Sequence, residues 1–292
     1  MKKYIAFDIG GTQIKYGIVS EIGILLEHQT VSTEAHLGGE QIVQKLIFLS
    51  QELMNQHAIS GIGISTAGIV DISKGMITGG VEHIPRYAGI PIIDRLKIAL
   101  KIPITVENDV NCAALGERWK GVGKKKQNFI MLTLGTGIGG AVVINKQLYR
   151  GHSFSAGEWG SMLIEGKPFE EVASISGLIH LVRQYKGEGN WDGKTIFNLY
   201  DEKDEEIVQA VQVFFKHLAI GISNLAYIFN PQTIIIGGGI TARGTKLLDE
   251  VKEEVQKYLH QEIYHTCEIS LAQNRNHAGM IGSIYHLLHP YE

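Results

Sequence analysis

The stretches Asp8-Ile9-Gly10-Gly11-Thr12 and Leu134-Gly135-Thr136-Gly137-Ile138-Gly139-Gly140 decide the fold. Each places a glycine turn between two apolar, strand-forming runs, at 4–7 and 14–19 for the first and at 129–132 and 141–144 for the second. Because glycine has no Cβ, the backbone N–H groups of such a turn can approach a phosphate group closely. The repetition predicts two strand-turn-strand hairpins that hold one polyphosphate.

The residues expected to bind that polyphosphate lie in and beside the two turns. A single Gly-Gly hairpin usually does no more than satisfy a turn with positive φ, so the second copy is what favours phosphate binding. Threonine hydroxyls at both turns add further donors. The candidates are Asp8, Gly10, Gly11, Thr12 and Lys15 at the first turn, and Thr133, Gly135, Thr136 and Gly137 at the second.

Composition describes a chain that can build a sizeable core, since 44% of its 292 residues are hydrophobic. A formal net charge of −3 argues against nucleic acid as a partner. Cys112 and Cys267 lie far apart in apolar surroundings and are expected to be buried free thiols. No run reaches the roughly 20 apolar residues of a membrane span, and the 12 histidines show no metal-binding spacing. We therefore expect a cytoplasmic protein with neither a membrane partner nor a metal cage.

Strands and helices alternate along the chain. Three strands are expected within 3–32, then a helix over 39–57, strands at 60–66 and 103–106, and a helix over 109–120. The second set of strands opens at 128 and is followed by helices near 205–228 and 244–260, with a strand at 233–236 between them. This order predicts an α/β sheet in each half of the chain.

The chemistry centres on Val106-Glu107-Asn108-Asp109-Val110-Asn111-Cys112. A strand that ends in a carboxylate and an amide just before a helix places those side chains at the carboxyl end of a sheet, where α/β proteins bind ligands. Asp109 is the candidate catalytic base. The alternative is that Asn108 or Asp109 only caps the helix, a role for which both residue types are preferred. Local sequence leaves these two interpretations equal.

The two glycine turns and the segment 106–117 resemble the ROK family of sugar kinases and related repressors, and the resemblance runs from Asp8 to the last helix, about 277–288. It implies a two-domain actin-like ATPase fold with a cleft between the domains, and an ATP-dependent sugar kinase. Asp109 would then be the base and Asn108 a sugar ligand. Mg²⁺ would enter with ATP, with Asp8 as an outer-shell partner of the metal.

The same resemblance implies further site residues. Gly68 belongs to 61–71, which is similar to the family's strand and turn under the sugar, although Ala67 replaces the usual proline. Glu158 and Glu170 lie in segments similar to those that carry the sugar-binding glutamates. An exposed helix start remains the alternative for the pair Glu170 and Glu171. The adenosine end is expected at Gly238 and Gly239, where a strand-to-helix turn without a ligand is the alternative.

The chain departs from the family at three further places. Ser161 stands where the family's motif has a histidine, and 162–169 lacks the cysteines that build a structural zinc site, so no zinc is expected. His83 lies in a sugar-side loop where relatives carry an asparagine and a tryptophan. Serine opens volume beside the sugar, so we expect phosphorylation of the 6-hydroxyl of a β-glucoside such as a cellobiose-like disaccharide. Glucokinase and N-acetylmannosamine kinase remain alternatives.

The expected domains are 1–120 plus 277–292, which would carry the first turn and Asp109, and 121–276, which would carry the second turn, the glutamates and the adenosine motif. The boundary is drawn at the glycine-flanked stretch 120–124. The family implies a homodimer. A sugar-responsive regulator that lacks its DNA-binding domain and a catalytically silent sugar sensor are the alternatives from other classes. The few residues before Asp8 argue against the usual DNA-binding module of the family's repressors, and the presence of Asp109 argues against the sensor.

Overall fold

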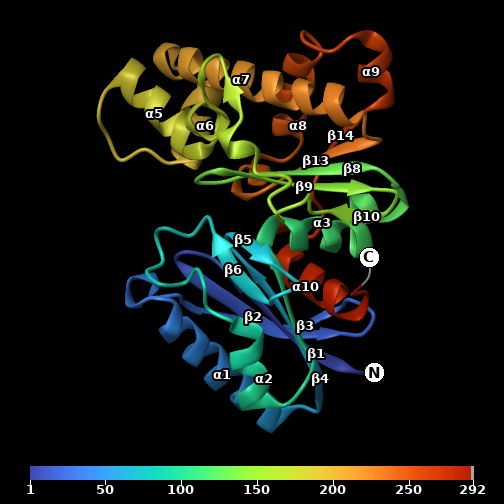
Figure 1. The fold of residues 1–292 in the computed structure, drawn as a ribbon. Coiled ribbons are helices and arrows are strands. Elements are labelled where there is room, and N and C mark those ends of the chain that lie inside the picture. The colour runs from blue at the N-terminus through green and yellow to red at the C-terminus, as the bar shows by residue number, and fades with distance from the viewer. Residues whose placement is uncertain (291–292) are drawn as a thin grey trace. The chain divides into compact units, whose positions relative to one another are not determined.

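The computed structural model describes residues 1–290, and they divide into two units. Unit 1 comprises Met1–Lys125, Lys146–Ala156 and the described residues from Asn276 onward. Unit 2 comprises Lys126–Asn145 and Gly157–Arg275. Each unit is built around a mixed β-sheet with helices packed on it (Figure 1). The domain boundaries expected from the sequence remain predictions.

The sheet of unit 1 has the strand order β3-β2-β1-β4-β7. Its strands are β1 (Lys3–Ile9), β2 (Gln13–Ser20), β3 (Leu25–Ser32), β4 (Ile59–Thr66) and β7 (Ile104–Asn108). β1, β2 and β3 form an antiparallel meander, whereas β1, β4 and β7 run parallel. In register, Ile9 pairs with Thr66, and Thr66 pairs with Asn108. The carboxyl ends of these three strands therefore meet at one edge of the sheet.

Helices cover both faces of this sheet. They are α1 (Gly39–Gln56), α2 (Ile92–Leu100), α3 (Asp109–Lys120) and α10 (Ala278–Leu288), with 3₁₀ turns at Ala35–Leu37 and Val122–Lys125. Alternation along β1 separates the two faces: Ile5 and Phe7 are buried with the apolar stripes of α1 and α2, whereas Tyr4 and Ala6 are buried with Met280 of α10. Figure 1 shows α1 and α2 side by side.

Glycines set the close approach of α3 and α10. A Cβ at Gly282 would overlap the Cys112 carbonyl oxygen, and a Cβ at Gly116 would lie 2.5 Å from the Ala278 carbonyl oxygen. The small residues of the last helix therefore serve packing, which brings the amino-terminal turn of α10 onto the sheet edge described above.

Unit 1 also contains elements that the sequence patterns did not predict. These are the hairpin β5 (Ile69–Asp71) and β6 (Met76–Gly79), helix α2, and the short strand β10 (Gln147–Tyr149). The hairpin begins directly after Gly68, whose φ of +96° places it in the region that favours glycine. The chain therefore leaves the edge of the sheet through this glycine and returns through the loop that carries His83.

In unit 2, the strands β9 (Ile138–Ile144), β8 (Phe129–Leu134), β13 (Thr233–Gly237) and β14 (Glu268–Leu271) lie side by side in that order. β8 and β9 are antiparallel around the second glycine turn, and β8, β13 and β14 are parallel. A two-stranded hairpin, β11 (Leu163–Ile164) with β12 (Lys167–Pro168), precedes the helices. The second glycine turn thus repeats the strand-turn-strand pattern of the first, as predicted.

The helices of unit 2 bury one large apolar core against this sheet. They are α4 (Phe169–Ala173), α5 (Ile175–Lys186), α6 (Gly193–Asp201), α7 (Glu205–Phe229), α8 (Thr245–Val255) and α9 (Gln261–Thr266), with 3₁₀ turns at Trp159–Ser161, Gly239–Arg243 and Arg275–His277. Side-chain caps from Ser174, Asp192 and Asp204 begin α5, α6 and α7. The helix expected over 244–260 ends at Val255, and α5, α6 and α9 were not predicted.

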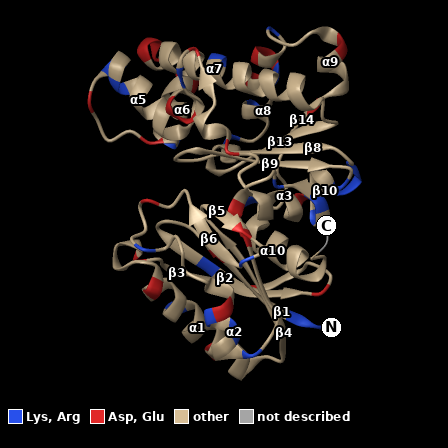
Figure 2. Cartoon of the chain, viewed as in Figure 1, with Lys and Arg blue, Asp and Glu red and all other residues tan. Residues whose placement is uncertain are grey.

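Among the described residues, α7 alone is long and apolar enough by length and composition to cross a membrane. Its most apolar window is 61% buried inside unit 2, which is the pattern of a core helix. Lysine and arginine are interspersed with aspartate and glutamate along both units (Figure 2), in keeping with the small net charge. Cys112 and Cys267 are buried and free, as expected.

Candidate active site

The first glycine turn is closed by backbone and side-chain hydrogen bonds within unit 1. The Gly10 N–H donates to the Gln13 carbonyl oxygen at 3.0 Å, and the Thr33 hydroxyl donates to the Gly10 carbonyl oxygen at 2.7 Å. Thr12 is held through its carbonyl oxygen, which accepts from the Thr33 N–H at 2.9 Å. The turn is therefore a rigid element whose glycines are exposed or partly exposed at the sheet edge.

Asp8 lies at the centre of this edge. Its Oδ1 accepts a hydrogen bond from the Ser65 hydroxyl at 2.7 Å, and its Oδ2 pairs with Lys15 Nζ at 3.1 Å. A Cβ at Gly279 would lie 2.7 Å from the Asp8 carboxylate, so the glycine lets α10 approach it. Two of the predicted nucleotide ligands, Asp8 and Lys15, thus form an ion pair beside the turn.

Asn108 caps the amino terminus of α3, which was one of the two roles that the sequence left open for Asn108 and Asp109. Its Oδ1 accepts from the Val110 and Asn111 N–H groups at 2.9 and 3.0 Å. Its Nδ2 donates to the Gly68 carbonyl oxygen and to Asp109 Oδ1, each at 3.0 Å. Both ends of this amide are engaged within unit 1, so a sugar contact from Asn108 would have to replace one of these bonds.

Asp109 is the first residue of α3, directly after the carboxyl end of β7. Its Oδ1 accepts from the Val110 N–H at 2.9 Å as well as from Asn108 Nδ2. Two donors therefore fix the orientation of this carboxylate in the first turn of α3. A carboxylate held in this way is suited to accept a proton from a hydroxyl group.

Gly68 and His83 complete the predicted residues of unit 1. The Gly68 carbonyl oxygen orients Asn108, as described above. The exposed His83 side chain lies against the first turn, because a Cβ at Gly11 would be 3.0 Å from His83 Nε2. The loop that was expected on the sugar side therefore also lies against the first glycine turn.

The second turn is shaped in unit 2 by its neighbours in space. The Gly135 N–H donates to the Gly137 carbonyl oxygen at 3.0 Å, and the Gly135 carbonyl oxygen accepts from the Ile175 N–H at 2.9 Å. The Thr133 hydroxyl donates to the Gly139 carbonyl oxygen at 3.4 Å, across the β8–β9 pair. Its donor is thus used within the sheet, whereas Thr136 lines a pocket.

Glu158 and Glu170 lie close enough in unit 2 for their charges to interact. Loss of hydration, and then the nearby negative charge of Glu170, raise the pKa of Glu158. The Glu170 carboxylate lies where a Cβ at Gly137 or Gly160 would be only 2.7 or 2.9 Å from its Oε2, so both positions are glycine to make room for it. Of the pair Glu170 and Glu171, Glu170 is the one whose charge acts on Glu158.

Ser161 ends the 3₁₀ turn Trp159–Ser161, which follows Glu158 directly. Its side chain is exposed. Trp159 is buried in the core and packs on Gly140, where no side chain would fit. The turn is therefore anchored by the indole, and it presents Glu158 and Ser161 from one short segment.

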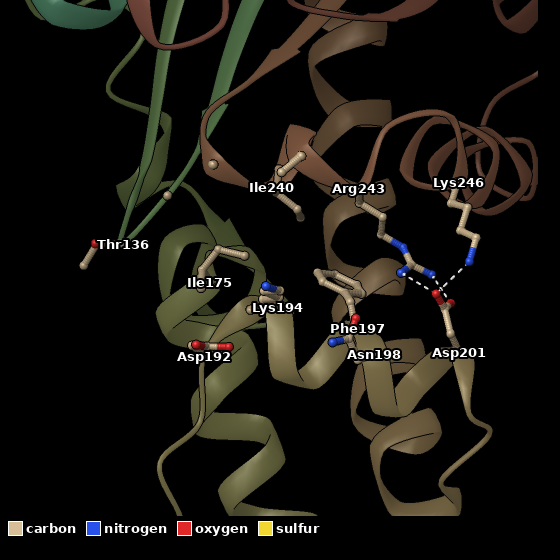
Figure 3. Close-up of a pocket in the computed structure, with 14 residues that line it drawn as sticks. Thr136, Ile175, Asp192, Lys194, Phe197, Asn198, Asp201, Ile240, Arg243 and Lys246 are labelled. Carbon is tan, nitrogen blue, oxygen red and sulfur yellow. Dashed lines mark hydrogen bonds and ion pairs between the residues drawn. The ribbon is translucent and has the colours of Figure 1, made fainter.

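A pocket of about 800 Å³ opens in unit 2 beside the second turn (Figure 3). Gly135, Thr136 and Gly239, all predicted from the sequence, contribute to its lining. The lining also includes residues of α5, α6, the 239–243 turn and α8 that were not predicted: Ile175, Asp192, Gly193, Lys194, Phe197, Asn198, Asp201, Ile240, Ala242, Arg243 and Lys246. The volume is in the range of small-molecule sites.

One end of this pocket is a network of charges. Arg243 pairs with Asp201 at 2.8 Å and with Glu250, and Lys246 pairs with Asp201 at 2.7 Å (Figure 3). Hydrogen bonds from Arg243 and then Lys246 lower the pKa of Asp201 to about 2. The Arg243 guanidinium also lies 4.6 Å from the Phe197 ring centroid. The network fixes the wall formed by α6 and by the 239–243 turn.

Gly238 lies between the end of strand β13 and the pocket-lining turn Gly239–Arg243. Its φ is +89°, and a Cβ there would overlap the Leu134 carbonyl oxygen at the end of β8. The glycine thus lets the β13 turn lie directly against the start of the second glycine turn. Asp192 caps α6 by accepting a hydrogen bond from the Thr195 N–H. An aspartate at this position is a sequence signal for the start of a helix, so it could have indicated α6.

No group of three or more histidine, cysteine, aspartate or glutamate side chains within residues 1–290 is arranged to hold a metal ion.

Comparison with known proteins identifies the family. A family model described as the ROK family matches residues 4–289. This chain belongs to the ROK family. A β-glucoside kinase of Klebsiella pneumoniae is 35% identical over 294 residues, which cover 97% of this chain and 95% of that protein. The motifs quoted above therefore indicated the correct family.

Two solved structures match nearly all of the chain. The Lmo2764 protein from Listeria monocytogenes, a candidate N-acetylmannosamine kinase, has a TM-score of 0.89 at 32% identity and covers 99% of this chain and 100% of its own. A ROK family glucokinase from Streptomyces griseus, in complex with glucose and AMPPNP, has a TM-score of 0.83 at 27% identity, with 96% and 97% covered. The two-domain actin-like ATPase fold and the class of ATP-dependent carbohydrate kinase are thereby confirmed.

Proposed function

We propose that this ROK kinase transfers the γ-phosphoryl group of ATP to the 6-hydroxyl of a β-glucoside such as cellobiose. The observation that carries the proposal is the Asp109 carboxylate, which two donors hold at the edge where β1, β4 and β7 end. Three parallel strands ending at one edge form the place where α/β enzymes carry out their chemistry.

In the proposed reaction, Asp109 accepts the proton of the sugar 6-hydroxyl. The oxygen attacks the γ-phosphorus, the bond between that phosphorus and the β,γ-bridging oxygen breaks, and ADP leaves with the negative charge. Asn108 acts here mainly by orienting Asp109, since its amide is engaged at both ends. Proton acceptance by a positioned carboxylate typically accelerates such reactions about 100-fold to 10,000-fold.

The nucleotide is proposed to bind unit 2 in the 800 Å³ pocket. Its apolar wall of Ile175, Phe197 and Ile240 suits a purine, and Lys194 and Lys246 supply positive charge for phosphates. The turn at Gly135 and Thr136 lines the same pocket, so its N–H groups are available to the polyphosphate.

Mg²⁺ is proposed to accompany ATP, where it would neutralise charge on the transferred phosphoryl group. Asp8 fits the role of an outer-shell partner rather than a direct ligand, because Ser65 and Lys15 already occupy its two oxygens. A carboxylate engaged in this way can still accept hydrogen bonds from water on a metal ion. Lys15 holds the charge of Asp8 in balance.

The acceptor preference rests on Ser161 and on the relatives. The Klebsiella β-glucoside kinase supports a glycoside, and a small exposed serine leaves room for a substituent on the sugar. Glu158 and Glu170 are proposed to accept hydrogen bonds from sugar hydroxyls. The pKa of Glu158 is raised, so its charged form is disfavoured in the free protein, and hydroxyl donors from a bound sugar would stabilise that form. His83 is proposed to contact the sugar. The protein is further proposed to act as a cytoplasmic homodimer without nucleic acid, membrane or structural zinc.

A monosaccharide acceptor is the second candidate, and the TM-score of 0.89 to the candidate N-acetylmannosamine kinase favours it. A coupled assay with ATP and Mg²⁺ that compares cellobiose, glucose and N-acetylmannosamine decides between them. We expect the highest kcat/KM with cellobiose, and the phosphate on the 6-position of the non-reducing glucose. A higher kcat/KM with either monosaccharide would contradict the acceptor assignment, and turnover with none of the three would contradict this choice of acceptors.

A further inference from the structure

Glu107, which directly precedes Asn108 and Asp109, is a buried carboxylate that the proposed mechanism does not use. Its side chain is 1% exposed, yet it accepts three hydrogen bonds. Oε1 accepts from the Asn108 N–H at 2.8 Å and from Asn111 Nδ2 at 3.0 Å, and Oε2 pairs with Arg150 Nε at 2.6 Å. A charge this deeply buried persists only when it is paired and hydrogen-bonded.

Arg150 is the cation of this pair and comes from a distant part of the sequence. Its side chain is 14% exposed, and it begins a loop that closes on itself, because its carbonyl oxygen accepts from the Ala156 N–H at 3.1 Å. His286 of α10 is also buried beside the pair, and burial lowers the pKa of its imidazole. His286 is therefore neutral at pH 7, so Arg150 balances the charge of Glu107.

The bonds of Glu107 converge on the start of α3. One bond fixes the peptide N–H of Asn108, and another fixes the side chain of Asn111, in the first turn of the helix. Asn108 in turn holds Asp109 Oδ1. Without Arg150 the Glu107 carboxylate would be a buried unpaired charge, and it would rotate or take up water or a proton. Each of these changes would weaken the hydrogen bonds that the Asn108 N–H and Asn111 Nδ2 donate to Glu107.

We propose that Arg150 and Glu107 form a positioning pair that holds the catalytic carboxylate Asp109 in its reactive orientation. This inference rests on the proposed role of Asp109 as the base. Glu107 acts on Asp109 through Asn108, whose N–H it binds and whose Nδ2 donates to Asp109 Oδ1. Small displacements of a catalytic group lower kcat strongly.

The test uses Arg150→Ala and the isosteric Glu107→Gln in the full-length protein, assayed with ATP and whichever sugar gives the wild-type enzyme its highest kcat/KM. The Glu107→Gln change removes the negative charge and places an amide donor against either Arg150 Nε or the Asn108 N–H and Asn111 Nδ2, so it breaks part of the arrangement without creating a cavity. The matched control is Arg95→Ala, which removes an exposed ion pair with Glu40 in the same unit. We expect kcat to fall at least tenfold in both pair variants, with KM for ATP within twofold of wild type.

Chemical rescue separates positioning from simple loss of structure. Guanidinium or methylguanidinium at low millimolar concentration should restore part of the kcat of Arg150→Ala, and should leave wild type, Arg95→Ala and Asp109→Asn unchanged. The inference is overturned if Glu107→Gln or Arg150→Ala keeps kcat within twofold of wild type, or if a folded Arg150→Ala is not rescued. An active wild type with an inactive Asp109→Asn would then leave the proposed function standing while this inference fails.

Discussion

Gly238→Ala tests whether the second glycine turn and the β13 turn form one structure. Gly238 has φ +89° and ψ 177°, a region that is essentially restricted to glycine. A methyl group there would also overlap the Leu134 carbonyl oxygen, which is backbone and has little freedom to move. Two separate costs therefore arise from one added carbon atom.

The size of the effect follows from these two costs. Forcing alanine into this backbone region costs about 1–3 kcal/mol. Relieving the overlap in a well-packed segment costs about another 1–3 kcal/mol. The sum of about 2–6 kcal/mol is a large share of the roughly 5–15 kcal/mol that stabilises a typical domain. At about 2–4 °C per kcal/mol, the melting temperature should fall by at least about 4 °C.

Gly239→Ala is the matched control, since Gly239 lines the pocket, has no positive φ and has open space where its Cβ would lie. Thermal unfolding monitored by calorimetry, with and without ATP, measures both variants. We expect Gly238→Ala to lose stability without ligand, and Gly239→Ala to keep its melting temperature while ATP stabilises it less. Equal melting temperatures for wild type and Gly238→Ala would refute this account of the turn.

Three further predictions concern the two ligands. Glu158→Gln should stabilise unit 2 at pH 7, because the raised pKa of Glu158 means that folding disfavours its charged form. This cost is absent at pH values below the ordinary carboxyl range, so urea unfolding at pH 7 and pH 3 should show the advantage of the variant disappearing in acid. An advantage that grew in acid would contradict this prediction. Lys194→Ala should raise KM for ATP about twofold to fivefold and leave KM for the sugar unchanged in steady-state kinetics. The control Lys186→Ala removes an ion pair with Asp204 outside the pocket and should change neither KM. An unchanged KM for ATP in Lys194→Ala would show that Lys194 does not contact the nucleotide. Ser161→His should lower kcat/KM for cellobiose at least about tenfold relative to glucose by filling the space beside the sugar, and an unchanged ratio would separate Ser161 from acceptor choice.

The sheet and its glycine turns were predictable because their signals are local. Alternating apolar runs on both sides of Gly10-Gly11 specify two strands and a turn, and the repeat at 134–140 specifies the same in unit 2. Asp109 was proposed as the base on the same kind of local signal, since a strand that ends in a carboxylate before a helix start is visible in a short window.

Other parts of the site depend on contacts between residues far apart in the sequence. Arg150 and Glu107 are 43 residues apart, and nothing around either residue indicates the other. Helix α6 and its Phe197 wall were missed because the segment is short and begins with Asp192-Gly193, a pair that also suits a turn. The choice between Glu170 and Glu171 required the packing of Gly137 and Gly160.

The central claim is that Asp109 accepts the proton of the sugar hydroxyl, and Asp109→Asn tests it most directly. Asparagine keeps the shape and the Oδ1 acceptor for the Val110 N–H, so the start of α3 should remain in place. The measurement is the rate of sugar phosphate formation at saturating ATP and sugar, together with the dissociation constants of both ligands. We predict a kcat lower by about 100-fold to 10,000-fold with both dissociation constants within a few-fold of wild type. Sugar phosphate formed at the wild-type rate by Asp109→Asn would contradict the account.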